Sequence, residues 1–297
     1  MFIKYTTIKE IKDHLLSLKK ENKTIGFVPT MGTLHRGHLS MIERAKCEND
    51  FSVVSIFVNP LQFNDKKDFE KYPRTLEQDI EKLKSVHCDI LFVPSAEEMY
   101  HDLLSHLSEA EHCLSKEEEL IEKTLDFGML NKIMEGKCRP GHFRGVCIVV
   151  KKLFDIIEAT RAYFGEKDFQ QLCIIKHMIK IFQMTVKIVS CPTIRESNGL
   201  AMSSRNILLN SDEKQNASYI SQTLFEAKRK YKEYSVDVLK KWMTEQINNN
   251  PFLMLEYFEV VDTETLTPVL SWTDTENIRA YIAVRIGNVR LIDNIQF

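Results

Sequence analysis

The sequence predicts an α/β protein whose first part is a doubly wound parallel sheet and whose second part is a smaller α+β domain. Strand-like and helix-like patterns alternate through the first two thirds of the chain, and the links between them are short. After about Ile194 the order changes, because two helix-like stretches come before two strand-like runs. The alternation is typical of a parallel sheet, and the grouped order is typical of an α+β domain.

The first predicted strand–helix–strand unit begins at Thr24. Thr24–Val28 is a short apolar run, and His38–Asn49 has apolar residues at helical spacing. The run FSVVSIFV, residues 51–58, is continuously apolar and β-branched. Such a run is expected of a strand that is buried on both faces. Together the three segments predict a βαβ unit.

Three further helix-like stretches each precede a strand-like run, so we expect the sheet to continue with more strands of the same kind. The pairs are Thr75–Val86 with DILFVP (89–94), Val146–Ile157 with RAYF (161–164), and Phe169–Met184 with VKIVSCP (186–192).

The C-terminal part has a different pattern. Helices are expected at Asp212–Glu233 and Val236–Asn248, followed by the strand-like runs LMLEYFEVVD and IRAYIAVRIG. We therefore assign residues 1–193 to one Rossmann-like domain and residues 194–297 to a small α+β domain.

Composition excludes several classes of partner. The 297 residues carry a formal net charge of −2, which gives no reason to expect nucleic acid or an anionic membrane as a partner. No apolar run is long enough to span a bilayer, and the N-terminus lacks the apolar stretch of a signal peptide. The seven cysteines form no CxxC pair, which argues against structural zinc and a disulfide framework. We expect buried thiols in a reducing cytoplasm.

The stretch PTMGTLHRGHL, residues 29–39, places two histidines where a predicted strand becomes a helix. Ligands of a doubly wound sheet bind at the carboxyl ends of strands, and helix N-terminal amides attract phosphate. Gly32 and Gly37 let a ligand approach the backbone, while His35 and His38 can donate to phosphate oxygens. The alternative is a helix cap with two surface histidines. A zinc site is less favoured, because HExxH is absent.

Amide side chains follow the second predicted strand of the βαβ unit. The stretch FVNPLQFN, residues 57–64, places Asn59 and Gln62 at the C-terminal end of that strand. Amides suit a hydroxyl or carboxylate substrate. An ordinary Asn-Pro turn is the alternative.

Two more stretches carry groups that suit a nucleotide. In YFGEKDFQQ, residues 163–171, Lys167 can neutralise phosphate and Asp168 can accept from a ribose hydroxyl, unless Asp168 is only a helix cap. In GLAMSSRN, residues 199–206, two serine hydroxyls and an arginine form a reasonable phosphate clamp, although SSR is common by chance.

These motifs resemble the pantoate–β-alanine ligase (pantothenate synthetase) family over nearly the whole chain. GFVPTMGTLHRGH, SIFVNPLQFN, YPRT, CRPGHFRGV, AYFGEKDFQQ and GLAMSSRN occur in the family's order. More broadly, the sequence resembles nucleotidyltransferases that have a HIGH-type motif and a mobile KMSKS-type loop. HRGH corresponds to the first of these, and MSSR corresponds to the second.

The resemblance implies the activity. The family joins D-pantoate and β-alanine to make pantothenate, converts ATP to AMP and pyrophosphate, and requires Mg²⁺. A carboxylate is a poor electrophile, so pantoate first becomes pantoyl adenylate, whose leaving group is AMP. Catalysis should then be mostly positioning and charge stabilisation. A homodimer is expected because the family is dimeric, and residues 194–297 are expected to act as a lid.

The resemblance also implies site residues. His35, His38, Lys167 and Arg205 are the expected catalytic residues, with His38 as proton donor. Gln62, Gln171 and Asn59 should hold pantoate, and Gln62 should also lie near β-alanine. Asp79 is the candidate Mg²⁺ carboxylate, and His142 is either near β-alanine or structural. The expected ATP site comprises Met31, Gly32, Thr33, Leu34, His35, Arg36, Gly37, His38, Gly165, Glu166, Lys167, Asp168, Ile194, Met202, Ser203, Ser204 and Arg205.

One region departs from the family pattern. After MY at residues 99–100, this chain is longer and lacks the usual proline before RPGHF. Its His101, His106, His112 and Cys113 suggest a metal site, but their spacing fits no pair of ligands on one helix. The alternative is a solvated amphipathic helix added to the surface.

Two other functions compete with the ligase. A related nucleotidyltransferase that moves AMP or CMP onto a phosphate acceptor would need basic residues where Gln62 and Gln171 stand. A nucleotide-binding regulatory protein without catalysis would be expected to lack His38, Lys167 or Arg205, and all three are present.

Overall fold

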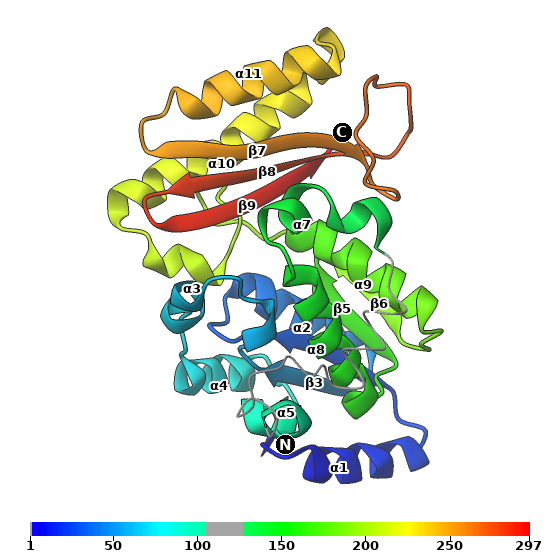
Figure 1. Cartoon of the computed structure of the whole chain (residues 1–297). Helices are drawn as coiled ribbons and strands as arrows, with labels where there is room; N and C mark the ends of the chain where they lie inside the picture. Colours follow the sequence, from blue (N-terminus) through cyan, green and yellow to red (C-terminus); the bar gives the residue numbers. More distant parts are fainter. Residues whose placement is uncertain (1, 105–126) are drawn as a thin grey trace. The chain divides into compact units, whose positions relative to one another are not determined.

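The computed structural model describes residues 2–104 and 127–297 (Figure 1), which form two compact units. The first unit comprises Met1–Phe127, Arg139–Gly165 and Ile174–Cys191. The second comprises Gly128–Cys138, Glu166–Cys173 and Pro192–Phe297. His106, His112 and Cys113 of the suggested metal site lie outside the described residues.

The first unit contains a sheet in which all six strands are parallel, in the order β1-β4-β3-β2-β5-β6. The chain proceeds from β2 outward through β3 and β4 on one side and through β5 and β6 on the other, which is the doubly wound arrangement. The predicted fold class is therefore confirmed. The strands are β1 (Ile3–Tyr5), β2 (Ile25–Thr30), β3 (Phe51–Ile56), β4 (Ile90–Phe92), β5 (Arg161–Gly165) and β6 (Lys187–Cys191).

The longer helices between these strands bury apolar side chains, as helices packed on a sheet must, whereas the short helix Lys66–Lys71 buries none of its residues. Helix α2 buries Met41, Ile42 and Ala45, and these residues share a core with Val28 and Val54 of the sheet. The main helices of this part of the chain are α1 (Ile8–Lys20), α2 (Arg36–Glu48), α3 (Lys66–Lys71), α4 (Leu76–Ser85), α5 (Ala96–Leu104), α8 (His142–Ile157) and α9 (Phe169–Ile181).

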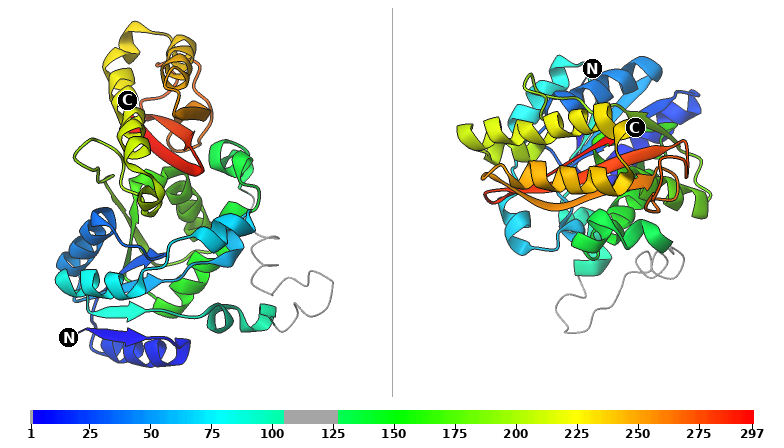
Figure 2. Two further views of the ribbon diagram at one scale, coloured as in Figure 1. Left: turned by 90° about the vertical axis from the view of Figure 1, so that its left-hand side faces the viewer. Right: turned by 90° about the horizontal axis from the view of Figure 1, so that it is seen from above.

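The second unit contains an antiparallel sheet of three strands in the order β7-β8-β9. The strands are β7 (Leu253–Asp262), β8 (Ile278–Ile286) and β9 (Val289–Gln296), and helices α10 (Ser211–Lys230) and α11 (Val236–Asn248) pack against them (Figures 1 and 2). A shared apolar core, which includes Leu224, Leu239 and Ile282, joins helices and strands. The predicted α+β character of this part is confirmed.

The sequence patterns did not predict β1, α1 and β9. Strand β1 has only three residues, too few to show a pattern of alternation. Strand β9 follows β8 through Gly287 and Asn288 alone, and Gly287 has the positive φ of +52° that so tight a turn requires. In the part of the chain that the structure describes, no helix is both long and apolar enough to cross a membrane.

Candidate active site

The turn after β2 carries the HRGH motif at the switch point of the sheet, between β3 and β5. Gly32 and Thr33 both adopt positive φ angles, +81° and +52°, so the backbone reverses sharply there. The Asp79 carboxylate of α4 stabilises this reversal, because its oxygens accept from the backbone N–H groups of Thr33 and Leu34, each at 2.7 Å. Helix α2 then begins at Arg36, with His35 as its N-cap.

The rings of His35 and His38 lie 3.9 Å apart and are each fixed by a backbone hydrogen bond. Nδ1 of His35 accepts from the N–H of Gly37 at 3.1 Å, and Nδ1 of His38 accepts from the N–H of His35 at 3.3 Å. A neutral imidazole whose Nδ1 accepts must carry its proton on Nε2. Both rings therefore have an N–H donor at Nε2. Each side chain can accept a backbone hydrogen bond at the helix start through Nδ1 and also carry a donor at Nε2.

Asn59 and Gln62 follow the carboxyl end of β3. Asn59 lies just before the short helix Pro60–Gln62, and Gln62 is its last residue. Asn59 is buried, and its amide donates to the carbonyl oxygen of Gly145 at 3.0 Å and accepts from the Tyr100 hydroxyl at 2.7 Å. It also caps the short helix by accepting from the N–H of Leu61. These contacts describe a residue that shapes the segment, while its predicted contact with pantoate stays a prediction.

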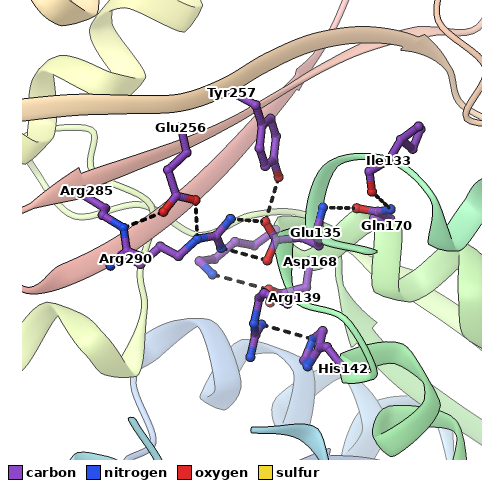
Figure 3. A network of polar contacts seen from close by, with 11 residues as sticks. Ile133, Glu135, Arg139, His142, Asp168, Gln170, Glu256, Tyr257, Arg285 and Arg290 are labelled. Atoms are coloured by element: carbon purple, nitrogen blue, oxygen red, sulfur yellow. Dashed lines mark hydrogen bonds and ion pairs between the residues drawn. The ribbon is translucent and has the colours of Figure 1, made fainter. Parts of the chain in front are cut away.

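Gln62 is oriented from both sides. Its amide Nε2 lies 2.7 Å from Sδ of Met31, which follows β2, and its backbone carbonyl oxygen accepts from Nδ1 of His142 at 2.9 Å. Nε2 of the same imidazole lies 3.1 Å from a guanidinium nitrogen of Arg139, which can only donate, so the proton of neutral His142 is on Nδ1 (Figure 3). His142 is thus placed to hold the Gln62 backbone, in line with the structural alternative.

In the second unit, the predicted nucleotide residues lie in two segments. Glu166–Asp168 form a short 3-10 helix before α9, and Lys167 lies 3.6 Å from the Asp168 carboxylate. Gln171 is half-buried in the first turn of α9. Gly165, which ends β5, belongs to the first unit.

The second segment contains the MSSR motif. Ile194 accepts from the N–H of Met202 at 3.0 Å, so the two ends of the loop between them are paired. Ser203 caps the 3-10 helix Ser204–Leu208 by accepting from the N–H of Arg205 at 3.3 Å. The structure therefore brings Ile194 close to the motif, while the predicted roles of these residues toward ATP stay predictions.

The family described as pantoate-beta-alanine ligase matches residues 4–296. The chain belongs to this family. It is 48% identical over 292 residues to the pantothenate synthetase of Phocaeicola vulgatus, covering 98% of each chain. It is 44% identical to that of Porphyromonas gingivalis, covering 99% of this chain and 98% of the relative.

Solved structures of the family agree with the fold. A crystal structure of pantothenate synthetase from Thermus thermophilus has a TM-score of 0.87 and 37% identity, covering 100% of this chain and 99% of that one. A Francisella tularensis pantoate-beta-alanine ligase, described as complexed with beta-gamma ATP and beta-alanine, has a TM-score of 0.77 and 38% identity, covering 100% and 98%.

The magnesium expected of a pantoate–beta-alanine ligase does not fit Asp79. The carboxylate is fully buried, and its oxygens are directed at backbone N–H groups, whose positive ends lie where a cation would bind. The Lys82 ammonium at 3.9 Å adds a further positive charge. Asp79 therefore orders the HRGH turn. Within residues 2–104 and 127–297, no group of three or more His, Cys, Asp or Glu side chains is arranged to hold a metal.

Sequence reasoning missed a buried ion-pair network in the second unit of this ligase (Figure 3). Glu135 accepts from two guanidinium nitrogens of Arg290, at 2.6 and 2.8 Å, and from the Tyr257 hydroxyl at 2.8 Å. Burial opposes the charge of Arg290, but its bonds to Glu135 and Glu256 outweigh this and raise the pKa of Arg290. Burial and the Glu135 charge raise the pKa of Tyr257 well above its usual range.

This network fixes the segment that precedes Arg139. The N–H of Glu135 donates to the Gln170 side chain at 3.0 Å, and Gln170 donates to the carbonyl oxygens of Leu130 and Ile133. Gln170 adjoins Gln171, so the first turn of α9 has its own anchor. In the sequence, the only sign of this anchor is the double glutamine, Gln170 and Gln171, of the family motif.

Proposed function

We propose that this chain joins (R)-pantoate to β-alanine, using ATP and releasing AMP and diphosphate, through a pantoyl-adenylate intermediate. The observation that carries the proposal is the family match over residues 4–296, with the HRGH motif at the start of α2. The Francisella relative, described as complexed with beta-gamma ATP and beta-alanine, supports the same substrates.

The first step activates the acid. A carboxylate oxygen of pantoate attacks the α-phosphorus of ATP, the bond to the bridging oxygen breaks, and diphosphate leaves with the electron pair. We assign the Nε2–H donors of His35 and His38 to the phosphate oxygens, where charge grows in the transition state. Lys167, Ser203, Ser204 and Arg205 are assigned to the same phosphates. Their hydrogen-bonding groups and positive charges suit anions.

The second step forms the amide. The β-alanine amine attacks the acyl carbon of the adenylate, AMP leaves, and the amine loses a proton. Gln62 and Gln171 are assigned to pantoate, and Gln62 also to β-alanine, because uncharged amides can both donate to carboxylates and accept from hydroxyls. Ile194 is assigned to the adenine side.

Four further features of the family are proposed here for this chain. Mg²⁺ is assigned to ATP without a ligand from Asp79, and a homodimer is expected. Residues 194–297 are proposed to shield the adenylate from water, since a reactive acyl adenylate would otherwise hydrolyse. A cytoplasmic location is supported by the six described cysteines, all of which are free thiols.

Isotope exchange between pyrophosphate and ATP tests the proposed chemistry. Because adenylate formation precedes the amine, pantoate with Mg²⁺ and ATP should support exchange when β-alanine is absent. Omission of pantoate is the control and should abolish exchange. If exchange appears only when β-alanine is added, the separate adenylation step is wrong. If pantoate never supports exchange or product formation, the chain is a nucleotide-binding protein without this activity.

A further inference from the structure

Strand β9 carries two consecutive buried polar residues, Asp293 and Asn294, and each is only 4% exposed. Neither belongs to a motif of the proposed site. Successive residues of a strand point to opposite faces, so the two side chains can serve two different neighbours. Both neighbours are segments that carry proposed nucleotide-binding residues.

Asn294 holds the segment that contains Lys167. Its Nδ2 group donates to the carbonyl oxygens of Glu166 and Lys167, at 2.8 and 2.9 Å. An amide NH₂ has two hydrogens, so both are used on consecutive carbonyl groups. The backbone of the turn that contains Lys167 is therefore fixed to β9 through the Asn294 side chain.

Arg279 of β8 fixes which way the Asn294 amide faces. One guanidinium nitrogen donates to Oδ1 of Asn294 at 2.5 Å, and the guanidinium lies 3.9 Å above the ring of Phe169. A guanidinium has no acceptor, so the amide must turn its oxygen to Arg279 and its NH₂ to the two carbonyl groups. A carboxylate at this position would leave both carbonyl groups without a donor.

Asp293 holds the second segment. Its two oxygens accept from Arg195 at 2.6 and 3.0 Å, a bidentate pair, and the Asp293 side chain is buried. Arg195 also donates to the carbonyl oxygen of Gly199 and pairs with Ala201 across the loop. The loop held in this way leads directly into Met202.

We propose that Asp293 and Asn294 are positioning residues that set the two phosphate-facing segments, Glu166–Asp168 and Ile194–Arg205, at a fixed spacing on one strand. The inference rests on the proposed function of Lys167 and Arg205. In this proposal, neither Asp293 nor Asn294 binds ATP itself. Asn294 acts directly on backbone carbonyl groups, and Asp293 acts through the Arg195 side chain. A misplacement of about 1 Å in the segments that they hold can cost about 10²-fold in rate.

The test is Asn294→Asp, which has nearly the same shape but cannot donate. We expect the ATP KM in pantoate-dependent exchange to rise at least about tenfold because the Lys167 backbone loses both donors. The pantoate KM should change less than about twofold, because Gln170 anchors α9 separately. Asp293→Asn should raise the ATP KM as well, through the MSSR loop. Asn288→Asp is the matched control, because Asn288 is exposed in the β8–β9 turn.

A merely structural role would lower the midpoint of thermal unfolding and shift both KM values together. If Asn294→Asp does not fold, Asn294→Ser is measured in its place. Its hydroxyl can donate to one carbonyl group only, so its ATP KM should still exceed that of the Asn288→Asp control. An ATP KM equal to that of the Asn288→Asp control, in a parent enzyme that is active, overturns the inference. A parent without exchange contradicts the proposed function instead.

Discussion

The histidines of the HRGH motif show that one imidazole can cap a helix and still present a donor. From sequence, a cap and a phosphate ligand were alternatives. The hydrogen bonds of both Nδ1 atoms show that the alternatives are compatible, because the Nε2–H groups do not take part in the caps. Spacing could place the two rings near one another, but it could not specify which ring nitrogen accepts.

Substitutions at His38 can separate its two roles. Asn keeps an acceptor near the position of Nδ1, so His38→Asn should retain the bond from the His35 N–H but lose the Nε2 donor. His38→Ala loses both. We expect both variants to lower kcat by about 10²–10³-fold, as for loss of one donor to developing charge. Steady-state kinetics measure this, and circular dichroism checks the fold. Near-parent activity in His38→Asn would reduce His38 to a helix cap.

At the scale of elements, Gly145 allows α8 to lie directly against the segment that carries Gln62. A Cβ atom at Gly145 would overlap the backbone carbonyl oxygen of Leu61, which cannot move without shifting the 3-10 helix Pro60–Gln62. Asn59 spans the same contact through the carbonyl oxygen of Gly145. The close approach of two backbones is therefore part of how Gln62 is placed.

Gly145→Ala should therefore affect pantoate more than ATP. We expect the free energy of unfolding to fall by about 1–3 kcal/mol, as for overpacking, and the pantoate KM to rise severalfold. Denaturant titration and the exchange assay measure the two effects. Gly128→Ala is a useful control, since a Cβ there meets nothing within 4 Å, although its φ of +48° adds some strain. An unchanged pantoate KM in Gly145→Ala would separate this contact from substrate binding.

The elements that the sequence predicted best are those with long, regular patterns. The buried strands β2 and β3 and the amphipathic helices α2 and α11 lie within a few residues of their expected bounds. The motifs that contain His35, Asn59 and Lys167 also lie at the carboxyl ends of strands β2, β3 and β5, as ligand-binding segments of a doubly wound sheet do. What could not be predicted are single long-range partners, such as Asn294 for the Lys167 carbonyl group, because no local periodicity encodes them. The buried bonds of Asp79 could not be predicted for the same reason.

At the scale of the whole molecule, buried thiols can report how stable the first unit is. Burial raises the pKa of Cys88 to about 12, and burial also raises the pKa of Cys147. Since the thiolate is the reactive form, very little of the buried Cys88 is reactive at pH 8. Cys47, on α2, is exposed.

We therefore expect a maleimide reagent at pH 8 to label Cys47 within minutes, while Cys88 and Cys147 react only through unfolding of the sheet that buries them. Peptide mapping by mass spectrometry, with and without denaturant, gives the reactivity of each site. Labelling of Cys88 as fast as that of Cys47 in the native protein would contradict the described burial.

The strand order of the parallel sheet has a consequence for how the family can change in length. Strands β2 and β5 are neighbours, and Gly26 of β2 is paired with Arg161 of β5. Along the chain, however, roughly 70 residues separate β5 from β4, the strand that precedes it. In the unfolded chain, the entropy lost on closing such a connection grows only with the logarithm of its length. Adding or removing about 20 residues there changes the closure cost by about 0.3 kcal/mol. Changes in the length of this connection therefore have almost no conformational-entropy cost to the strands that it joins.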